Sequence, residues 1–210
     1  MLVAIYLFDG VTALDAVGPY EVLSRAPDAE VLFVGNEKGG VRTGNGFLGL
    51  SVDASLAQVD APDVLIIPGG NSSSVAVAAR DEGLLSWIRR NDLVSRWTCS
   101  VCTGSILLGA AGLLRGRSVA TNWRAREFLP RFGAVYSEQR VTFDGKYVTS
   151  AGVTAGLDMA LRLSEHLSGR AVAEAIELSI EYDPQPPYGT GRWQEATPER
   201  VALVEGHLRN

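Results

Sequence analysis

Short runs of apolar residues alternate along this chain with stretches in which apolar positions recur every three or four residues. The short runs predict buried strands, and the periodic stretches predict helices that cover a sheet. Strands are expected at Leu2–Phe8, Glu30–Gly35, Asp63–Ile67, Arg96–Val101 and Ser118–Thr121, a small hairpin at Val41–Val52, and two strands within Val135–Thr149 around the turn pair Asp144-Gly145. Helices are expected at Leu14–Ala26, Leu84–Asn91, Thr103–Leu114, a stretch ending at Leu129, Thr154–Leu167, Ala171–Tyr182 and Pro198–Leu208.

Strands that alternate with helices favour an α/β fold in which a mostly parallel sheet is covered on both faces. No internal repeat or interdomain linker breaks the pattern, so residues 1–210 are predicted to form one domain. The Pro- and Gly-rich stretch Asp183–Gly191 marks a C-terminal extension from about residue 184. Ligands of such sheets bind beyond the carboxyl ends of the strands, so the loops after Phe8, Ile67 and Val101 should carry the chemistry.

Charge and cysteine content narrow the classes of function. With 19 Lys+Arg against 24 Asp+Glu, the net charge of −5 lacks the basic excess of a general nucleic-acid binder. No apolar run approaches the roughly 20 residues of a membrane helix, and the opening run ends at Asp9 without a basic flank. Two cysteines cannot form a disulfide framework. We therefore expect a cytoplasmic protein without a nucleic-acid or membrane partner.

Cys102 stands where a strand is expected to run directly into a helix. The residues from Ser100 to Ser105 have the layout of a nucleophile elbow, a sharp turn that lifts a reactive atom above the sheet edge. The helix N-terminus is expected to lower the pKa of the thiol and so favour the nucleophilic thiolate. Most free cysteines are instead small buried hydrophobes, and that is the expectation for Cys99 inside the strand.

Cys99 and Cys102 also form a Cys-x-x-Cys pair, which is typical of dithiol redox centres. In an extended strand their Cα atoms would lie about 10 Å apart, beyond the roughly 7 Å limit for a disulfide. A zinc site would need a second pair of ligands beside His166 and His207. Covalent catalysis by a thiol needs neither a second cysteine nor a zinc ion, so no metal or organic cofactor is expected.

Two further strand ends are candidates for the same site. Asp15 follows the first strand, where it is either the N-cap of a helix or a proton shuttle beside the Cys102 sulfur. Gly69 and Gly70 follow the strand that ends at Ile67, where they form either a plain turn or a set of backbone N–H donors. With the N–H of Thr103, such donors would stabilise negative charge that develops on a substrate atom.

These segments, in this order, resemble the ThiJ/PfpI superfamily over roughly Leu2 to Tyr188, and within it the isonitrile hydratase branch. Regulator sensor domains share much of the pattern. The resemblance is carried by Leu14-Asp15, Gly18-Pro19-Tyr20, Ile67-Pro68-Gly69-Gly70, Ser100 to Ser105, Gly109 to Leu114, Gly152 to Asp158 and Glu181 to Tyr188. It implies a flavodoxin-like, doubly wound fold and a homodimer with its sites near the subunit contact.

The resemblance also implies roles for single residues. Cys102 would be the nucleophile, Asp15 the acid and base, and Thr103 the residue after the nucleophile that helps to form the site. Thr154 would line the pocket. Many relatives read Thr-His-Trp where this chain has Thr121-Asn122-Trp123, so a Cys–His–acid triad is not expected here. Asn122 and Trp123 are assigned to substrate contact, with a core or interface position as the alternative for Trp123.

The function implied is hydration of an isonitrile to an N-substituted formamide, through a thioimidate on Cys102. A second hypothesis is an enzyme that acts on small reactive carbonyls such as 2-oxoaldehydes, because a thiolate also adds to aldehydes. A third is a sensor domain without turnover, in which Cys102 is oxidised. Only three residues, Leu208-Arg209-Asn210, follow His207, so no DNA-binding helix pair is expected. The expected partners are a small-molecule substrate and a second copy of the chain.

Overall fold

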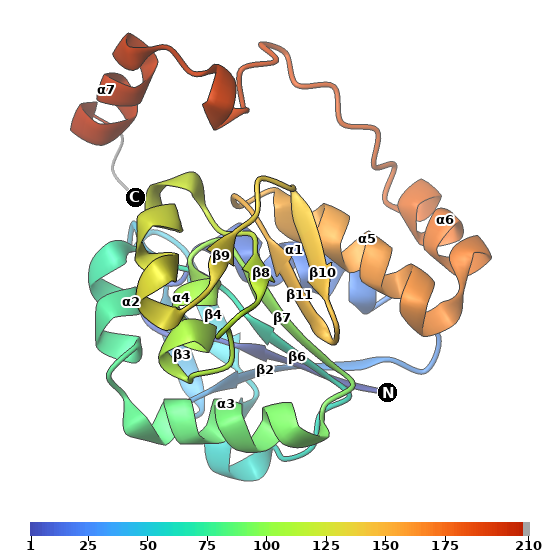
Figure 1. The fold of residues 1–210 in the computed structure, drawn as a ribbon. Helices are drawn as coiled ribbons and strands as arrows, with labels where there is room; N and C mark the ends of the chain where they lie inside the picture. The colour runs from blue at the N-terminus through green and yellow to red at the C-terminus, as the bar shows by residue number, and fades with distance from the viewer. Residues whose placement is uncertain (208–210) are drawn as a thin grey trace.

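A computed structural model describes residues 1–207 of the chain. A seven-stranded sheet runs through the molecule in the order β10-β11-β7-β6-β1-β2-β5, and every neighbouring pair is parallel except the β10–β11 hairpin (Figure 1). Its strands are β1 (Leu2–Tyr6), β2 (Glu30–Gly35), β5 (Ala54–Ser55), β6 (Val64–Ile67), β7 (Trp97–Val101), β10 (Val141–Asp144) and β11 (Tyr147–Ser150). The predicted α/β fold with a mostly parallel sheet is confirmed.

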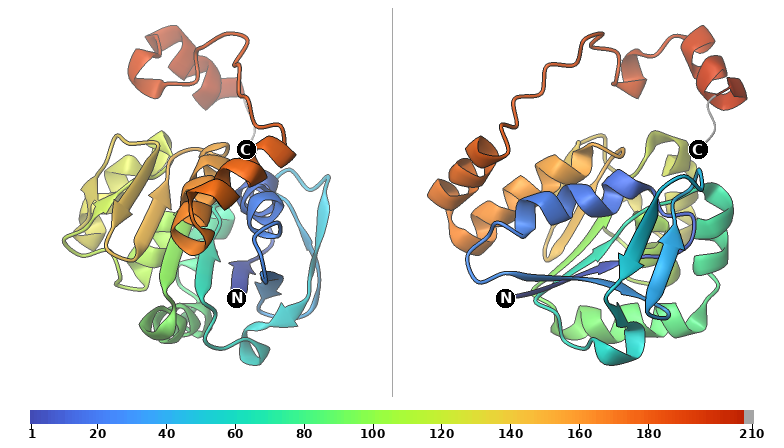
Figure 2. Two further views of the ribbon diagram at one scale, coloured as in Figure 1. Left: turned by 90° about the vertical axis from the view of Figure 1, so that its right-hand side faces the viewer. Right: turned by 180° about the vertical axis from the view of Figure 1, so that it is seen from behind.

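Helices cover both faces of this sheet (Figures 1 and 2). On one face α1 packs against α5, and α5 packs against α6. On the other face α2 and α3 pack against α4, which lies on β6 and β7. The helices are α1 (Ala13–Leu23), α2 (Ser72–Ala78), α3 (Glu82–Val94), α4 (Gly104–Ala110), α5 (Ala155–Ser168) and α6 (Arg170–Ser179).

Smaller elements surround the sheet. Two separate two-stranded sheets are formed by β3 (Gly39–Arg42) with β4 (Gly49–Val52), and by β8 (Ser118–Val119) with β9 (Val135–Tyr136). Three 3₁₀ helices are η1 (Leu56–Gln58), η2 (Trp123–Phe132) and η3 (Trp193–Glu195). The predicted C-terminal helix is α7 (Pro198–His207), and its predicted last residue, Leu208, lies outside the described residues.

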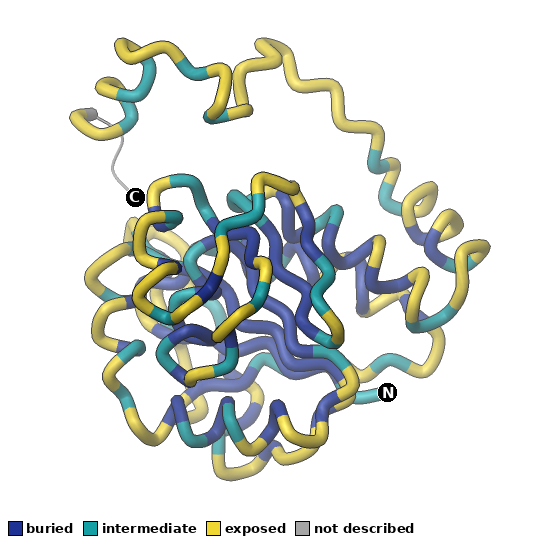
Figure 3. The backbone as a smooth tube through the Cα atoms, in the orientation of Figure 1, coloured by how far each residue is buried: buried dark blue, intermediate teal, exposed yellow. Residues whose placement is uncertain are grey.

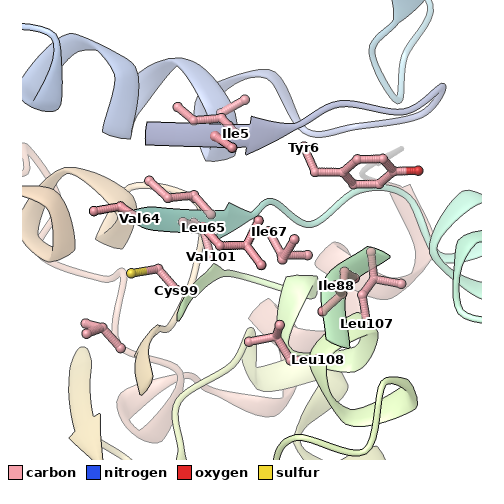
Figure 4. Close-up of a cluster of buried hydrophobic side chains, with 14 of the residues drawn as sticks. Ile5, Tyr6, Val64, Leu65, Ile67, Ile88, Cys99, Val101, Leu107 and Leu108 are labelled. Atoms are coloured by element: carbon pink, nitrogen blue, oxygen red, sulfur yellow. The ribbon is translucent and has the colours of Figure 1, made fainter. Parts of the chain in front are cut away.

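The central strands form the core because both of their faces are covered. All four residues of β6 are fully buried, which explains why this strand is a continuous apolar run rather than an alternating one. Figure 3 shows the buried backbone concentrated in the sheet, and Figure 4 shows Cys99 within the apolar cluster that also contains Val64 and Val101. Cys99 is fully buried, as expected for a strand cysteine.

The C-terminal extension leaves the body after α6 and runs across to α7 (Figure 1), and it contacts the body through Trp193. The hydroxyl of Tyr182 donates a hydrogen bond to Asp158 at 3.0 Å before the chain departs. The Trp193 indole then donates to the hydroxyl of Tyr136 at 3.1 Å, and the guanidinium of Arg126 lies 4.3 Å from the Trp193 ring centre. None of the helices over residues 1–207 has the length and apolarity of a membrane span.

The turn from β7 into α4 needs a glycine at position 104. A Cβ atom placed on Gly104 would lie only 1.9 Å from the carbonyl oxygen of Ile67, so the backbones of β6 and α4 approach too closely for any side chain.

We therefore expect Gly104→Ala to destabilise the protein by at least about 2 kcal/mol, because backbone atoms cannot move aside as a flexible side chain can. Urea denaturation would measure the change. Gly40→Ala is the matched control, because a Cβ at Gly40 meets no atom within 4 Å. Equal stability of the two variants would contradict the packing described here.

Candidate active site

Cys102 occupies a strained turn between β7 and α4. Its φ angle is +57°, a left-handed backbone conformation that residues other than glycine rarely adopt. This sharp turn has the geometry predicted for a nucleophile elbow. The turn is held through the main chain of Cys102. Its N–H donates to the carbonyl of Ser150 at 3.2 Å, and its carbonyl accepts from the hydroxyl of Thr121 at 3.0 Å. The hydroxyl of Ser105 donates to that of Thr121 at 2.8 Å, which completes a buried network under the elbow.

Asp15 lies beside Cys102 and is completely buried. The N-cap of α1 is Thr12, so Asp15 is not the cap but sits in the first turn of the helix. The backbone N–H of Gly69 donates to Asp15 Oδ2 at 3.0 Å. Within residues 1–207, Oδ1 has no conventional hydrogen-bond partner, while the carboxyl as a whole interacts with the Cys102 thiol. The structure thus brings the two expected residues together.

Burial disfavours charge on both groups, and the Asp15 carboxylate further disfavours charge on Cys102. Burial raises the pKa of Asp15 from 3.8 to about 7, despite the hydrogen bonds from Gly69 and Cys102. Burial, followed by the nearby Asp15 carboxylate, raises the pKa of the Cys102 thiol as well. The backbone N–H of Thr103, the N-cap of α4, lowers this pKa as expected for a helix N-terminus, but burial raises it by more, so the expected net decrease is wrong. Below and around neutral pH the pair retains a proton.

Two donors favour the thiolate form of Cys102. Hydrogen bonds from the backbone N–H of Thr103 and from the side chain of Asn122 both lower the pKa of the thiol, although less than burial raises it. Asn122 is the N-cap of η2, and its Oδ1 accepts from the backbone N–H of Arg124 at 3.0 Å. That bond orients the amide and leaves its NH₂ group for the sulfur.

The glycine N–H groups after β6 are already used. The N–H of Gly69 binds Asp15, and the N–H of Gly70 donates to the hydroxyl of Thr103 at 3.1 Å. A Cβ atom at Gly69 would lie 2.8 Å from Asp15 Oδ2 and 2.4 Å from Thr103 Oγ1, so this glycine fits between the two side chains. The expectation that Gly69 and Gly70 aim free donors at a substrate is wrong, because side chains of the site itself accept these bonds.

A cavity of about 660 Å³ opens over Cys102. Most of its lining is apolar. The lining residues come from six segments, which are the stretches after β1, β6, β7 and β11, the β3–β4 loop, and η2. The sequence reasoning missed the lining from α2 and from this loop. The larger apolar residues of the lining are Leu14, Phe47, Leu48, Val75, Ile106, Phe128 and Val153. Such a volume and lining are typical of sites for small organic ligands.

Three residues expected at the substrate do not line this cavity, namely Gly69, Trp123 and Thr154. Thr154 is exposed and its hydroxyl accepts from Arg140 at 3.1 Å, while the preceding residue, Val153, lines the cavity instead. Trp123 is half-buried in η2 and is also absent from the lining, although its neighbour Asn122 is part of it. The ring of His166 lies far along α5, packed against Trp97 and Phe143 at centroid distances of 5.3 and 4.9 Å.

The sequence is similar to a known protein family and to several characterised proteins. Residues 1–166 match the profile of the DJ-1/PfpI family. Isonitrile hydratase from Pseudomonas putida is 40% identical over 185 residues, which are 88% of this chain and 80% of that protein. The HTH-type transcriptional regulator CdhR from Pseudomonas aeruginosa is 31% identical over 143 residues, which are 66% of this chain and 40% of the regulator.

Solved structures show the same architecture. The crystal structure of a THiJ/PfpI family protein from Pseudomonas syringae superimposes with a TM-score of 0.92 at 34% identity, covering 97% of this chain and 84% of that one. Drosophila melanogaster DJ-1beta superimposes with a TM-score of 0.76 at 22% identity, covering 87% and 98% of the two chains, which shows a shared fold.

The raised pKa of Asp15 makes stability depend on pH. The folded state binds a proton more tightly than the unfolded state, so this contribution to stability is complete below about pH 4 and is lost as the pH rises to about 7. Asp15→Asn removes the buried carboxylate and keeps an acceptor for Gly69. We expect it to stabilise the protein at pH 8 by on the order of 2 kcal/mol, and by much less at pH 5. Thermal unfolding at both pH values measures this, and an equal change at both would contradict it.

Proposed function

The chain belongs to the DJ-1/PfpI family, and from this premise we propose that it is a cysteine enzyme that hydrates an isonitrile to an N-substituted formamide. The proposal rests above all on one observation: the Cys102 thiol lines an apolar cavity and is in hydrogen-bond contact with the buried carboxyl of Asp15. The 40% identity to isonitrile hydratase from Pseudomonas putida supports this choice of substrate.

In the first half of the reaction, Cys102 and Asp15 act on the terminal carbon of R–N≡C. The thiolate forms an S–C bond, and Asp15 gives its proton to the same carbon, which leaves the thioimidate R–N=CH–S–Cys102 and an Asp15 carboxylate. Asn122 and the N–H of Thr103 stabilise the thiolate before attack.

In the second half, water replaces the sulfur. The Asp15 carboxylate takes a proton from water, the hydroxide adds to the thioimidate carbon, and Asp15 passes the proton to nitrogen. The hydroxyl of the resulting adduct then returns a proton to Asp15 while the C–S bond breaks. The products are R–NH–CHO and the Cys102 thiolate beside protonated Asp15, which is the starting state.

The same thiol would add to a small carbonyl, and relatives such as CdhR are regulators. The apolar character of the cavity favours the isonitrile over a small polar 2-oxoaldehyde, whose oxygens would lose hydrogen bonds to water there. Product analysis after incubation with cyclohexyl isocyanide and, separately, with methylglyoxal distinguishes the two reactions. Reaction of Cys102 with mild peroxide, without turnover of either compound, would favour the sensor.

Replacement of the nucleophile tests the proposal directly. We expect Cys102→Ala to lower the hydration rate of cyclohexyl isocyanide by at least about 10³-fold, because no other thiol reaches the cavity. Formation of N-cyclohexylformamide would be followed by mass spectrometry. Cys99→Ala is the matched control, since Cys99 is fully buried in β7 and absent from the cavity lining, and it should retain activity. Wild-type turnover by Cys102→Ala would refute the mechanism.

The pH dependence of the rate tests the shared proton. Attack needs one proton on the pair, so kcat/KM should rise as the pH increases through about 7, where the doubly protonated pair loses a proton. Asp15→Asn removes a carboxylate that raises the pKa of the Cys102 thiol, so alkylation of Cys102 by iodoacetamide should shift to lower pH. An unchanged alkylation profile would show that Asp15 does not share the proton.

A further inference from the structure

The mouth of the cavity is unusually apolar for a surface. Phe47 and Phe128 both line the cavity, yet their exposed fractions are 87% and 44%. Leu48, next to Phe47, also lines it and is 48% exposed. Large apolar side chains at the edge of a cavity expose area that a ligand can cover, and each such group gains from being covered.

Phe47 is held in place although its side chain is exposed. Its backbone N–H donates to Asn45 Oδ1 at 3.1 Å, and the hydroxyl of Thr43 donates to the same oxygen at 3.0 Å. The N–H of Gly44 donates to the carbonyl of Val11 at 3.0 Å, which ties the β3–β4 loop to the segment that leads into α1 and Asp15. The loop therefore has a defined position relative to the reacting groups.

Phe128 comes from η2, the same element whose N-cap is Asn122. The guanidinium of Arg131 lies 4.9 Å from the Phe128 ring centre and supports its position. Two aromatic residues about 80 positions apart in the sequence thus line one cavity. Phe47 lies in a loop that is bonded to the segment before Asp15, and Phe128 lies in the helix that Asn122 caps.

The volume sets the size of the ligand. A cavity of about 660 Å³ lies within the range of sites for organic molecules larger than methyl isocyanide. With the terminal carbon at the Cys102 sulfur, a methyl substituent would leave the apolar mouth empty. A ring-bearing substituent would extend toward Phe47 and Phe128.

We propose that Phe47 and Phe128 are specificity-determining residues that select isonitriles with bulky, ring-bearing apolar substituents. This inference rests on the proposed isonitrile reaction but concerns only the substituent R. Each additional buried methylene should raise kcat/KM about fourfold, so the wild-type enzyme should prefer cyclohexyl over methyl isocyanide by more than tenfold.

The test compares selectivity rather than activity. Phe47→Ala and Phe128→Ala should each lower the ratio of kcat/KM for cyclohexyl to methyl isocyanide by about tenfold, because the ring loses its cover. Leu93→Ala is the control, since Leu93 is 82% exposed on α3 and absent from the cavity lining, and the ratio should not change. An unchanged ratio in both phenylalanine variants would overturn the inference.

A binding measurement separates this inference from the proposed function. Calorimetry measures the binding of N-cyclohexylformamide and N-methylformamide to Cys102→Ala and needs no turnover. Adding Phe47→Ala to this variant should weaken the binding of N-cyclohexylformamide and leave that of N-methylformamide unchanged. If this pattern holds while no isonitrile is hydrated by the wild type, the proposed reaction fails and the assignment of the mouth stands. If Phe47→Ala instead changes the sedimentation mass and leaves the binding of both formamides unaltered, Phe47 is a contact between copies of the chain and the inference is wrong.

Discussion

The site depends on the contact between Asp15 and Cys102, two acidic groups that lie side by side away from water. Each group is costly to ionise because it is buried, and an Asp15 carboxylate makes ionisation of Cys102 more costly still. The pair therefore carries at most one negative charge near neutral pH. In such a pair, a small movement of one proton converts a thiol beside a carboxylate into a thiolate beside an acid. That acid is the proton donor that a neutral electrophile such as an isonitrile requires.

The surrounding backbone is arranged to hold this pair rather than to bind an anionic substrate atom. Gly69 uses its N–H on Asp15 and Gly70 uses its N–H on Thr103, so neither donor remains for an oxyanion. Acyl transfer develops charge on a carbonyl oxygen and depends on such donors. Addition to an isonitrile develops charge on the carbon that receives the proton of Asp15, so direct proton transfer takes the place of an oxyanion hole. The hydrogen bonds of the glycine turn thus favour the isonitrile mechanism.

Local patterns predict the architecture and the elbow well. The continuous apolar runs of β1 and β6 predict buried parallel strands, and Cys102 between β7 and α4 predicts the strained turn. Other features depend on tertiary contacts that a pattern does not contain. The short helix α2 consists mainly of serine, alanine and valine and has no clear periodicity, yet Asn71 caps it and it lines the cavity.

The net pKa shift of Cys102 differs from the expectation for the same reason. A helix N-terminus is visible in a sequence, whereas the degree of burial and the distance to Asp15 are set by the packed sheet. Asn122 is an instructive case. Its amide faces the sulfur where many relatives are expected to carry a histidine, and an amide donates a hydrogen bond without adding a titratable group. The protonation state of the site is then determined by Asp15 and Cys102.

The apolar cavity and the buried pair satisfy one physical requirement. An isonitrile has no hydrogen-bond donor, so it offers the protein little to recognise except its substituent. Affinity must then come from apolar contact, and the contact area lies in the cavity wall and at its mouth. In the proposed reaction, a substituent that fills this space also excludes water from the thiolate during the first addition, which strengthens the interaction between the charge on sulfur and the donors Asn122 and Thr103. Binding of R and activation of the sulfur are therefore linked through the same loss of water.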